Sequence, residues 1–338
     1  MRESEGRWML DAPLSRGMTA SLAAFVLVAL LPPAQAQEFP SRTVTIVVPF
    51  APGGSADITS RMLAEKLAAR FGKPVVVENR AGAGTVVGAM AVARSAPDGH
   101  TLLTGGSSAM AYNVTLHKNL PYDPLKDFVP IAHVASTPFV LVVQPGLPVH
   151  SVADLVKLAK DKPGGLAFGT AGIGSPAHLC AEYLRSLTGI DITYIPYKGT
   201  APAVTDFLAG QIPAMFVDLP PVLPLIREGK MRALGVSSKT AAAAAPEIVP
   251  LAQVGLPGYD AGGWLMFVAP AKTPKAIVDR LHSEFKAVAE SSEIRRKFTT
   301  MGLTPVDSPP IADLQRFVTS EIDRWGRVIR SAGLAATQ

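Results

Sequence analysis

Four loops in this sequence combine glycine with hydroxyl or carboxyl side chains, a composition suited to holding an anion. They are 50–57, 105–108, 170–175 and 218–221, and each follows a strand-like apolar run and precedes a helix-like segment. Glycine lets the backbone approach a ligand closely, and hydroxyl groups donate hydrogen bonds. The first N–H groups of a helix lack partners and carry partial positive charge. The four loops therefore indicate a site that holds a carboxylate or a similar anion.

The hydroxyl groups of these loops are the candidate donors. Hydrogen bonds to a charged group contribute about 1.5–3 kcal/mol each. Four to six of them are therefore sufficient for micromolar affinity, about 8 kcal/mol, after entropic costs and without an arginine. The candidate hydroxyls are those of Ser55, Thr104, Ser107, Ser108, Thr170 and Ser175.

Several polar residues near the loops have a structural role as an alternative to ligand contact. Asp57 and Ser175 stand at predicted helix starts, where capping is the favoured role. Asp218 follows a strand, where it could accept a hydrogen bond from a ligand amine or hydroxyl, or could fold back onto the loop amides. His178 lies one turn into a helix, either facing a ligand cleft or packed as a buried histidine.

Patterns typical of enzymes and metal proteins do not occur. The sequence contains no Gly-x-Ser-x-Gly elbow, and its six histidines have no metal-ligand spacing. Cys180 is the only cysteine, which excludes an intramolecular disulfide and a cysteine-rich metal site. Gly82-Ala83-Gly84 and Gly172-Ile173-Gly174 lack the third glycine of a dinucleotide fingerprint. We therefore expect no catalytic residues, no cofactor and no metal.

The charge pattern bears on partners. The formal net charge is +5, with the basic residues scattered along the chain rather than gathered with aromatic residues. This distribution argues against a nucleic-acid partner. We expect a monomer.

The amino-terminal segment has the pattern of a secretory signal peptide. An apolar run, Ser21–Leu31, is followed by Pro32-Pro33 and by Ala34-Gln35-Ala36. The run is too short for a membrane anchor, which needs roughly 17–25 residues. We expect residues 1–36 to be removed by cleavage after Ala36, translation to start at Met1, Met9 or Met18, and the protein to reach the periplasm.

The rest of the chain alternates strand-like and helix-like segments, which predicts an α/β fold with mainly parallel sheets. The run Thr43–Val48 predicts a strand, and Ile58–Phe71 predicts a helix. A similar passage begins with the strand 166–169 and a helix whose first position is Pro176, where a missing N–H costs nothing. The likeness of the two passages suggests two lobes with a cleft between them.

These motifs, in this order, resemble those of a known receptor family. The segments 39–57, 77–84, 97–103 and 122–124 look like the first part of Bug proteins, the TctC-like extracytoplasmic solute receptors of tripartite tricarboxylate transporters. The segments 168–175, 194–199 and Gly263-Trp264 continue the likeness. It covers essentially the whole chain after the signal peptide.

The resemblance implies a two-lobed periplasmic binding protein of the type II-like α/β class, with a ligand cleft between the lobes and two hinge strands. We place the hinge strands at Phe139–Val143 and Trp264–Val268. The first lobe is then 37–141 plus 260–338, and the second is 142–259.

The resemblance also implies the site residues and their ligand. Loops of both lobes would hold a carboxylate, from a di- or tricarboxylate, an amino acid or an aromatic acid. A receptor that signals to a membrane sensor kinase, or a secreted enzyme on the same scaffold, is the alternative to a receptor for the membrane components of the transporter. The predicted ligand-binding residues are Phe50, Ala51, Gly54, Ser55, Asp57, Ser107, Ser108, Asn113, Thr170, Ala171, Gly174, Ser175, His178 and Asp218.

Overall fold

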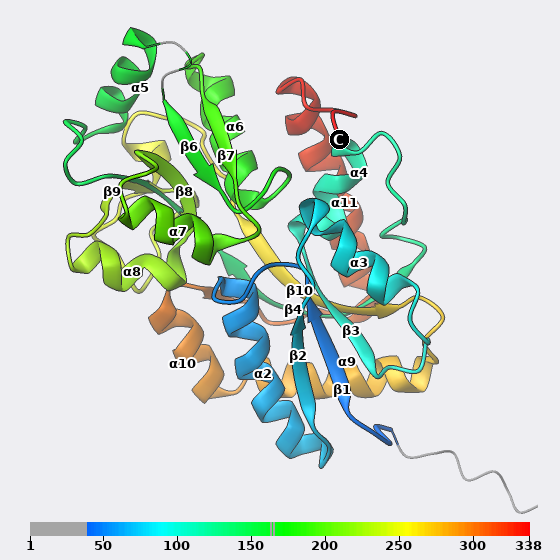
Figure 1. Ribbon diagram of the computed structural model, residues 1–338. Coiled ribbons are helices and arrows are strands. Elements are labelled where there is room, and N and C mark those ends of the chain that lie inside the picture. Colours follow the sequence, from blue (N-terminus) through cyan, green and yellow to red (C-terminus); the bar gives the residue numbers. More distant parts are fainter. Residues whose placement is uncertain (1–38, 163, 165) are drawn as a thin grey trace, which may run out of the picture. The chain divides into compact units, whose positions relative to one another are not determined.

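Two mixed β-sheets organise the chain in a computed structural model that describes residues 39–162, 164 and 166–338 (Figure 1). Residues 40–338 form one compact unit, to which everything below refers. The predicted signal peptide, 1–36, lies outside the described residues.

The first sheet has six strands in the order β11-β4-β10-β3-β1-β2. Parallel pairing joins β1 to β2 and to β3, whereas β10 runs antiparallel between β3 and β4. The strands are β1 (Val44–Val48), β2 (Val75–Asn79), β3 (Thr101–Gly106), β4 (Phe128–Thr137), β10 (Gly263–Pro270) and β11 (Thr304–Pro305).

The second sheet has five strands in the order β7-β6-β8-β5-β9. Strand β6 pairs parallel with β7 and β8, whereas β5 pairs antiparallel with β8 and β9. The candidate loops 170–175 and 218–221 follow β6 and β8. The strands are β5 (Phe139–Val143), β6 (Ala167–Thr170), β7 (Thr193–Pro196), β8 (Ala214–Asp218) and β9 (Arg232–Val236).

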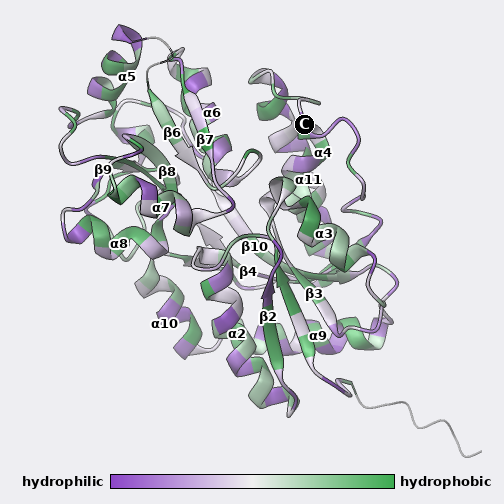
Figure 2. Cartoon of the chain, in the orientation of Figure 1, coloured by the Kyte–Doolittle hydropathy of each residue, from purple (hydrophilic) through white to green (hydrophobic). Residues whose placement is uncertain are grey.

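Helices pack on both sheets and bury their apolar sides. Hydrophobic colouring runs along β8 and β9, whereas α2 and α10 carry hydrophobic and hydrophilic residues together (Figure 2). None of the helices described is both long and apolar enough to cross a membrane. The helices are α2 (Ser55–Phe71), α3 (Val86–Ala93), α4 (Asn113–Leu116), α5 (Val152–Asp161), α6 (Pro176–Thr188), α7 (Thr200–Leu208), α8 (Leu219–Arg227), α9 (Lys275–Ala289), α10 (Ser292–Met301) and α11 (Ile311–Ser331), with short turns η1 (Ala83–Thr85), η2 (Ser108–Tyr112) and η3 (Leu251–Gln253).

The chain passes directly from the first sheet to the second at Pro138, the residue between β4 and β5, and returns to the first sheet between β9 and β10. The ends of β4 and β10 therefore lie at the junction of the two sheets. These crossing segments therefore line the space between the two sheets where the sheets meet.

The predicted alternation of strands and helices is confirmed, with shifts at several boundaries. Helix α2 begins at Ser55 rather than Ile58, and its N-cap is Gly54. Asp57 therefore lies inside the first turn, and the prediction that it caps the helix is wrong. The sequence analysis did not predict the ten-residue strand β4 or the helix α10.

Candidate functional site

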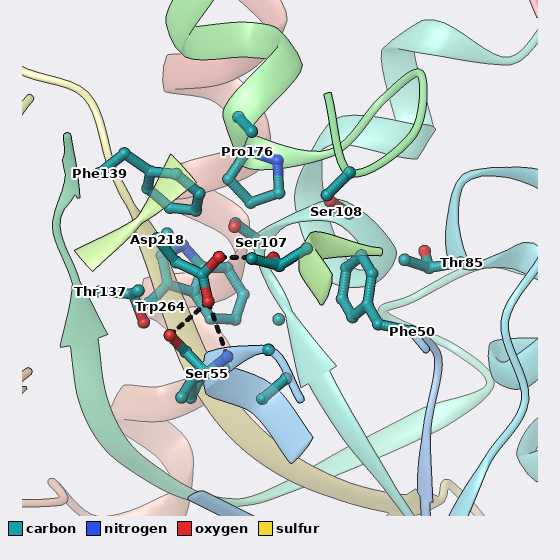
Figure 3. Close-up of a pocket in the computed structure, with 18 of the residues that line it drawn as sticks. Phe50, Ser55, Thr85, Ser107, Ser108, Thr137, Phe139, Pro176, Asp218 and Trp264 are labelled. Carbon is teal, nitrogen blue, oxygen red and sulfur yellow. Dashed lines mark hydrogen bonds between the residues drawn. The ribbon is translucent and has the colours of Figure 1, made fainter. Parts of the chain in front are cut away.

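A pocket lies where the loops of the first sheet meet those of the second. We call it the inner pocket; its empty space, open mouth included, is about 600 Å³. Phe50, Ser55 and Ser107 line it from the first sheet, and Ala171 and Asp218 line it from the second. Figure 3 shows the labelled side chains around this space.

Hydrogen bonds between the loops of the two sheets close the pocket. The Ala51 N–H donates to the Lys198 carbonyl oxygen at 2.9 Å. The Ser108 hydroxyl donates to the Gly174 carbonyl oxygen, also at 2.9 Å. These contacts bring the loops after β1 and β3 against those after β7 and β6.

Asp218 makes the most extensive of these contacts. Its carboxylate accepts hydrogen bonds from the Ser55 N–H at 2.7 Å, the Ser55 hydroxyl at 2.5 Å and the Thr200 hydroxyl at 2.5 Å (Figure 3). The Ser55 N–H belongs to the first turn of α2, so the carboxylate occupies the position where that helix attracts an anion. These hydrogen bonds match the second role predicted for Asp218, that of bonding to loop amides.

The start of α6 leaves one backbone N–H at the pocket wall without an intrahelical partner. Pro176 is the first helical residue and has no N–H, and the Ser175 hydroxyl caps the helix by accepting the His178 N–H at 3.2 Å. Ala177 is buried and lines the pocket. Its N–H is therefore the remaining donor of this turn, because the first N–H groups of a helix have no intrahelical partner.

A second donor comes from the end of β4. Thr137 is 4% exposed and lines the pocket, and its hydroxyl has no hydrogen-bond partner among the described residues. A buried hydroxyl without a partner is costly, which makes Thr137 a group that a ligand would satisfy.

Half of the predicted ligand-binding residues line the inner pocket. Ser175 lines an adjoining pocket that shares Phe50, Thr85 and Ala171 with the inner one. The predicted residues that line the inner pocket are Phe50, Gly54, Ser55, Ser107, Ser108, Ala171 and Asp218. Those that line neither pocket are Ala51, Asp57, Asn113, Thr170, Gly174 and His178.

Asn113 and Thr170 use their side chains to bond backbone groups of the loops. The Asn113 side-chain amide donates to the Gly84 carbonyl oxygen at 2.9 Å. Thr170 donates its hydroxyl to the Gly172 carbonyl oxygen at 2.8 Å. Both therefore shape loops of the site from within.

The carboxyl group of Asp57 is also held by its own neighbourhood. It accepts hydrogen bonds from the Gly53 N–H at 3.0 Å and from the Arg61 guanidinium at 3.1 Å. Burial alone would raise the pKa of Asp57, but these hydrogen bonds outweigh it and hold the pKa below its ordinary value.

His178 is enclosed rather than placed in a pocket. Its ring lies 4.6 Å from that of Tyr194, and its Nε2 is 3.7 Å from a Glu182 carboxylate oxygen. Burial lowers the pKa of His178 to about 4, with Arg185 acting in the same direction. The imidazole is therefore neutral at pH 7.

The sequence analysis did not select several residues of the pocket wall as ligand contacts. Trp264 was noted as part of the Gly263-Trp264 motif and as the start of a predicted hinge strand, but not as a ligand contact. Its ring is buried, and its Nε1 donates to Glu321 at 2.9 Å. No local pattern marks the others as ligand contacts; they lie at strand ends and helix starts, and are Thr85, Thr137, Phe139, Pro176, Ala177 and Thr200.

No group of three or more histidine, cysteine or acidic side chains in the described part of the chain is arranged to hold a metal ion.

Comparisons with known proteins agree on one family. The profile of the family described as "Tripartite tricarboxylate transporter family receptor" matches residues 59–334. Protein BugT of Bordetella pertussis (strain Tohama I) is 40% identical over 302 residues, which cover 89% of this chain and 92% of BugT.

Solved structures agree as well. Rpa4515 of R. palustris with adipate has a TM-score of 0.83 and 35% identity, covering 88% of this chain and 99% of the other. The periplasmic binding protein BugD has a TM-score of 0.84 and 32% identity with the same coverage. The fold is therefore that of a two-lobed periplasmic binding protein.

Proposed function

Because the chain belongs to the tripartite tricarboxylate transporter receptor family, we propose that it captures a small organic carboxylate in the inner pocket. Members of this family are periplasmic solute-binding receptors and not enzymes. One observation carries the proposal: Ala177 and Thr137 are buried, line the pocket and each have a donor to offer, Thr137 at the end of β4 in the first sheet and Ala177 in α6, which packs on the second. We propose that the carboxylate of the acid accepts a hydrogen bond from each of them.

Binding in this position links the acid to closure. Thr137 ends the strand that crosses to the second sheet, and Ala177 belongs to a helix packed on that sheet. An acid that bonds both stabilises the closed arrangement over an open one. We propose that the closed form is what the membrane components of a tripartite tricarboxylate-type transporter recognise, and that the lobes are 37–141 with 260–338, and 142–259.

A thermal-shift screen tests the binding step. Residues 37–338 are heated with straight-chain mono- and dicarboxylates of two to eight carbons, each beside its primary amide. An acid at about 100 times its Kd raises the unfolding free energy by about 2.7 kcal/mol, whereas its amide, which lacks the charge, gives no comparable rise. No rise with any acid, from folded protein freed of bound ligand, would overturn the proposal.

Two variants test the donors. Ala177→Pro removes one N–H from the first turn of α6, where proline is tolerated. Helix α8 of this chain already begins Leu219-Pro220-Pro221, so consecutive prolines fit such a turn. Thr137→Val removes the other donor. Each variant should weaken acid binding about tenfold, the loss of one charge-assisted hydrogen bond, with circular dichroism unchanged.

We propose further that residues 1–36 direct export to the periplasm. Amino-terminal sequencing of the protein from a periplasmic fraction should then begin at Gln37. Recovery of the intact amino terminus from the cytoplasmic fraction would contradict this.

A further inference from the structure

The wall of the inner pocket carries one charged side chain, that of Asp218. The described residues that line the pocket include no lysine, arginine or histidine. Asp218 is 4% exposed, and its hydrogen-bond partners, Ser55 and Thr200, are uncharged. The wall as a whole is therefore anionic.

The hydrogen bonds of Asp218 leave little capacity for a ligand. An ionised carboxylate has about four acceptor positions. The Ser55 N–H, the Ser55 hydroxyl and the Thr200 hydroxyl use three of them. Asp218 is thus held by the protein, and an ammonium group of a ligand would find at most one free position there.

Most of the remaining wall is apolar. Phe50 and Phe139 line the pocket as aromatic rings, and Pro176 lies between them in the labelled view (Figure 3). Trp264 satisfies its N–H on Glu321, so its ring carbons are what it contributes to the wall. The ring edge of Phe139 and the Pro176 side chain also lie close to Gly263, at 3.3 and 3.4 Å from where a Cβ would stand. This packing gives a firm hydrophobic surface.

From this wall we infer that the pocket selects acids with a single carboxylate and an uncharged, apolar body. The inference rests on the proposed function, since the single carboxylate is the group held by Ala177 and Thr137. A second carboxylate would be buried without a cation and beside Asp218, where both desolvation and repulsion oppose it. An α-ammonium group would lose its hydration without gaining enough acceptors.

Four acids that differ by one feature each test this selection. Hexanoate, adipate and 2-aminohexanoate share six carbons and add, in turn, a second carboxylate or an amine. Acetate keeps the carboxylate and lacks the apolar body. Calorimetric titration should give hexanoate a Kd at least about tenfold below those of the other three, a difference of about 1.4 kcal/mol.

The outcomes separate the inference from the function on which it rests. Adipate or 2-aminohexanoate binding as tightly as hexanoate overturns the selection while leaving carboxylate capture intact. Acetate binding as tightly as hexanoate shows that the apolar wall contributes nothing, and also overturns it. Absence of binding by every acid of the wider screen overturns the proposed function itself.

A variant that removes the charge of Asp218 tests whether this residue causes the selection against a second carboxylate. Asp218→Asn keeps the size of the side chain and removes its charge, so the preference for hexanoate over adipate should shrink by about tenfold. Asp206→Asn is the matched control, because Asp206 lines neither pocket and its carboxylate accepts a hydrogen bond from the Tyr197 hydroxyl, at 2.7 Å. An unchanged preference in folded Asp218→Asn would contradict the assignment, and the wild-type titrations test it independently should that variant not fold.

Lys198 provides the remaining test. It is exposed and lines the adjoining pocket with Phe50 and Ala171. We expect Lys198→Ala to leave the preference unchanged. A selective loss of adipate binding in this variant would mean that a second carboxylate is accommodated at the mouth, against the inference.

Discussion

Asp218, at the end of β8, accepts two hydrogen bonds from Ser55, at the start of α2, and so joins the second sheet to the first. One comes from the backbone N–H at 2.7 Å and one from the hydroxyl at 2.5 Å. A side-chain carboxylate thereby occupies the anion position at the start of α2. We therefore propose that an acid binds elsewhere in the pocket, at the Ala177 N–H and the Thr137 hydroxyl.

Removing one of the hydroxyl groups that donate a hydrogen bond to Asp218 should destabilise the protein. Ser55→Ala and Thr200→Val each delete one hydrogen bond to a buried carboxylate, and hydrogen bonds of this kind contribute about 1.5–3 kcal/mol. We expect a loss of that size in the free energy of unfolding, measured with urea. Thr205→Val is the control, since its exposed hydroxyl bonds only Ala201 in the same helix. Equal effects from Thr200→Val and Thr205→Val would refute the stabilising role of the Asp218 contacts.

The close approach of Gly84 to the loop 170–175 should be required for the loops of the two sheets to close over the pocket. Its φ is +57°, and a Cβ there would lie 2.9 Å from the Ile173 carbonyl oxygen of the second sheet's loop. Gly72 has a similar φ, +61°, but nothing within 4 Å of a Cβ. Gly72→Ala should cost only the backbone strain, about 1–2 kcal/mol. Gly84→Ala should lose the same stability through backbone strain and should also bind acids more weakly, which calorimetric titration measures. Equal acid affinities in the two variants would contradict this prediction.

Ser175 should act on stability rather than on binding. Its hydroxyl caps α6 by accepting the His178 N–H, and loss of such a cap costs about 1 kcal/mol. Ser186→Ala, on the exposed side of the same helix, is the control. We expect urea unfolding to report the cap loss only in Ser175→Ala. A large fall in acid affinity at unchanged stability would instead place Ser175 against the ligand.

Two buried histidines should make the fold sensitive to acid. Burial lowers the pKa of both His178 and His133 from 6.5 to about 4. The unfolded chain takes up these protons as the pH falls below 6.5, whereas the folded chain does so only near pH 4. Stability should therefore fall between pH 6.5 and 4, by up to about 3 kcal/mol for each histidine.

Urea unfolding at pH 7, 5 and 4 measures this decline. His133→Phe removes one titrating group and keeps a ring that stacks on Phe317, now 4.9 Å away. The variant should show about half of the histidine-dependent decline. An identical pH dependence in variant and wild type would rule out His133 as a source.

Local rules predicted the elements whose chemistry is local. The β-branched run at 43–48 became β1, and Pro176 begins α6. Each depends on residues within one turn or one strand. The start of α2 was misplaced because the helical spacing of large apolar residues begins only at Ile58, although Ser55, Ala56 and Asp57 already lie in the helix.

Features that depend on segments far apart in the sequence could not be predicted from local patterns. Strand β4 contains Pro130, His133 and Ser136, which break any apolar pattern, and it is stabilised by pairing with β10 and β11. The candidate site shows the same limit. Asp218 was selected from its position after a strand, but its partner Ser55 begins α2, 163 residues earlier in the chain, and only the folded chain brings them together.

A crystal structure of residues 37–338 with 6-bromohexanoate would test the central claim most directly, because anomalous scattering locates the bromine without a model of the ligand. Carboxylate capture between the sheets predicts the carboxylate on the Ala177 N–H and the Thr137 hydroxyl, with the bromine against the Phe139 and Trp264 rings. A fully occupied bromine elsewhere on the protein, with the inner pocket holding only water, would contradict it.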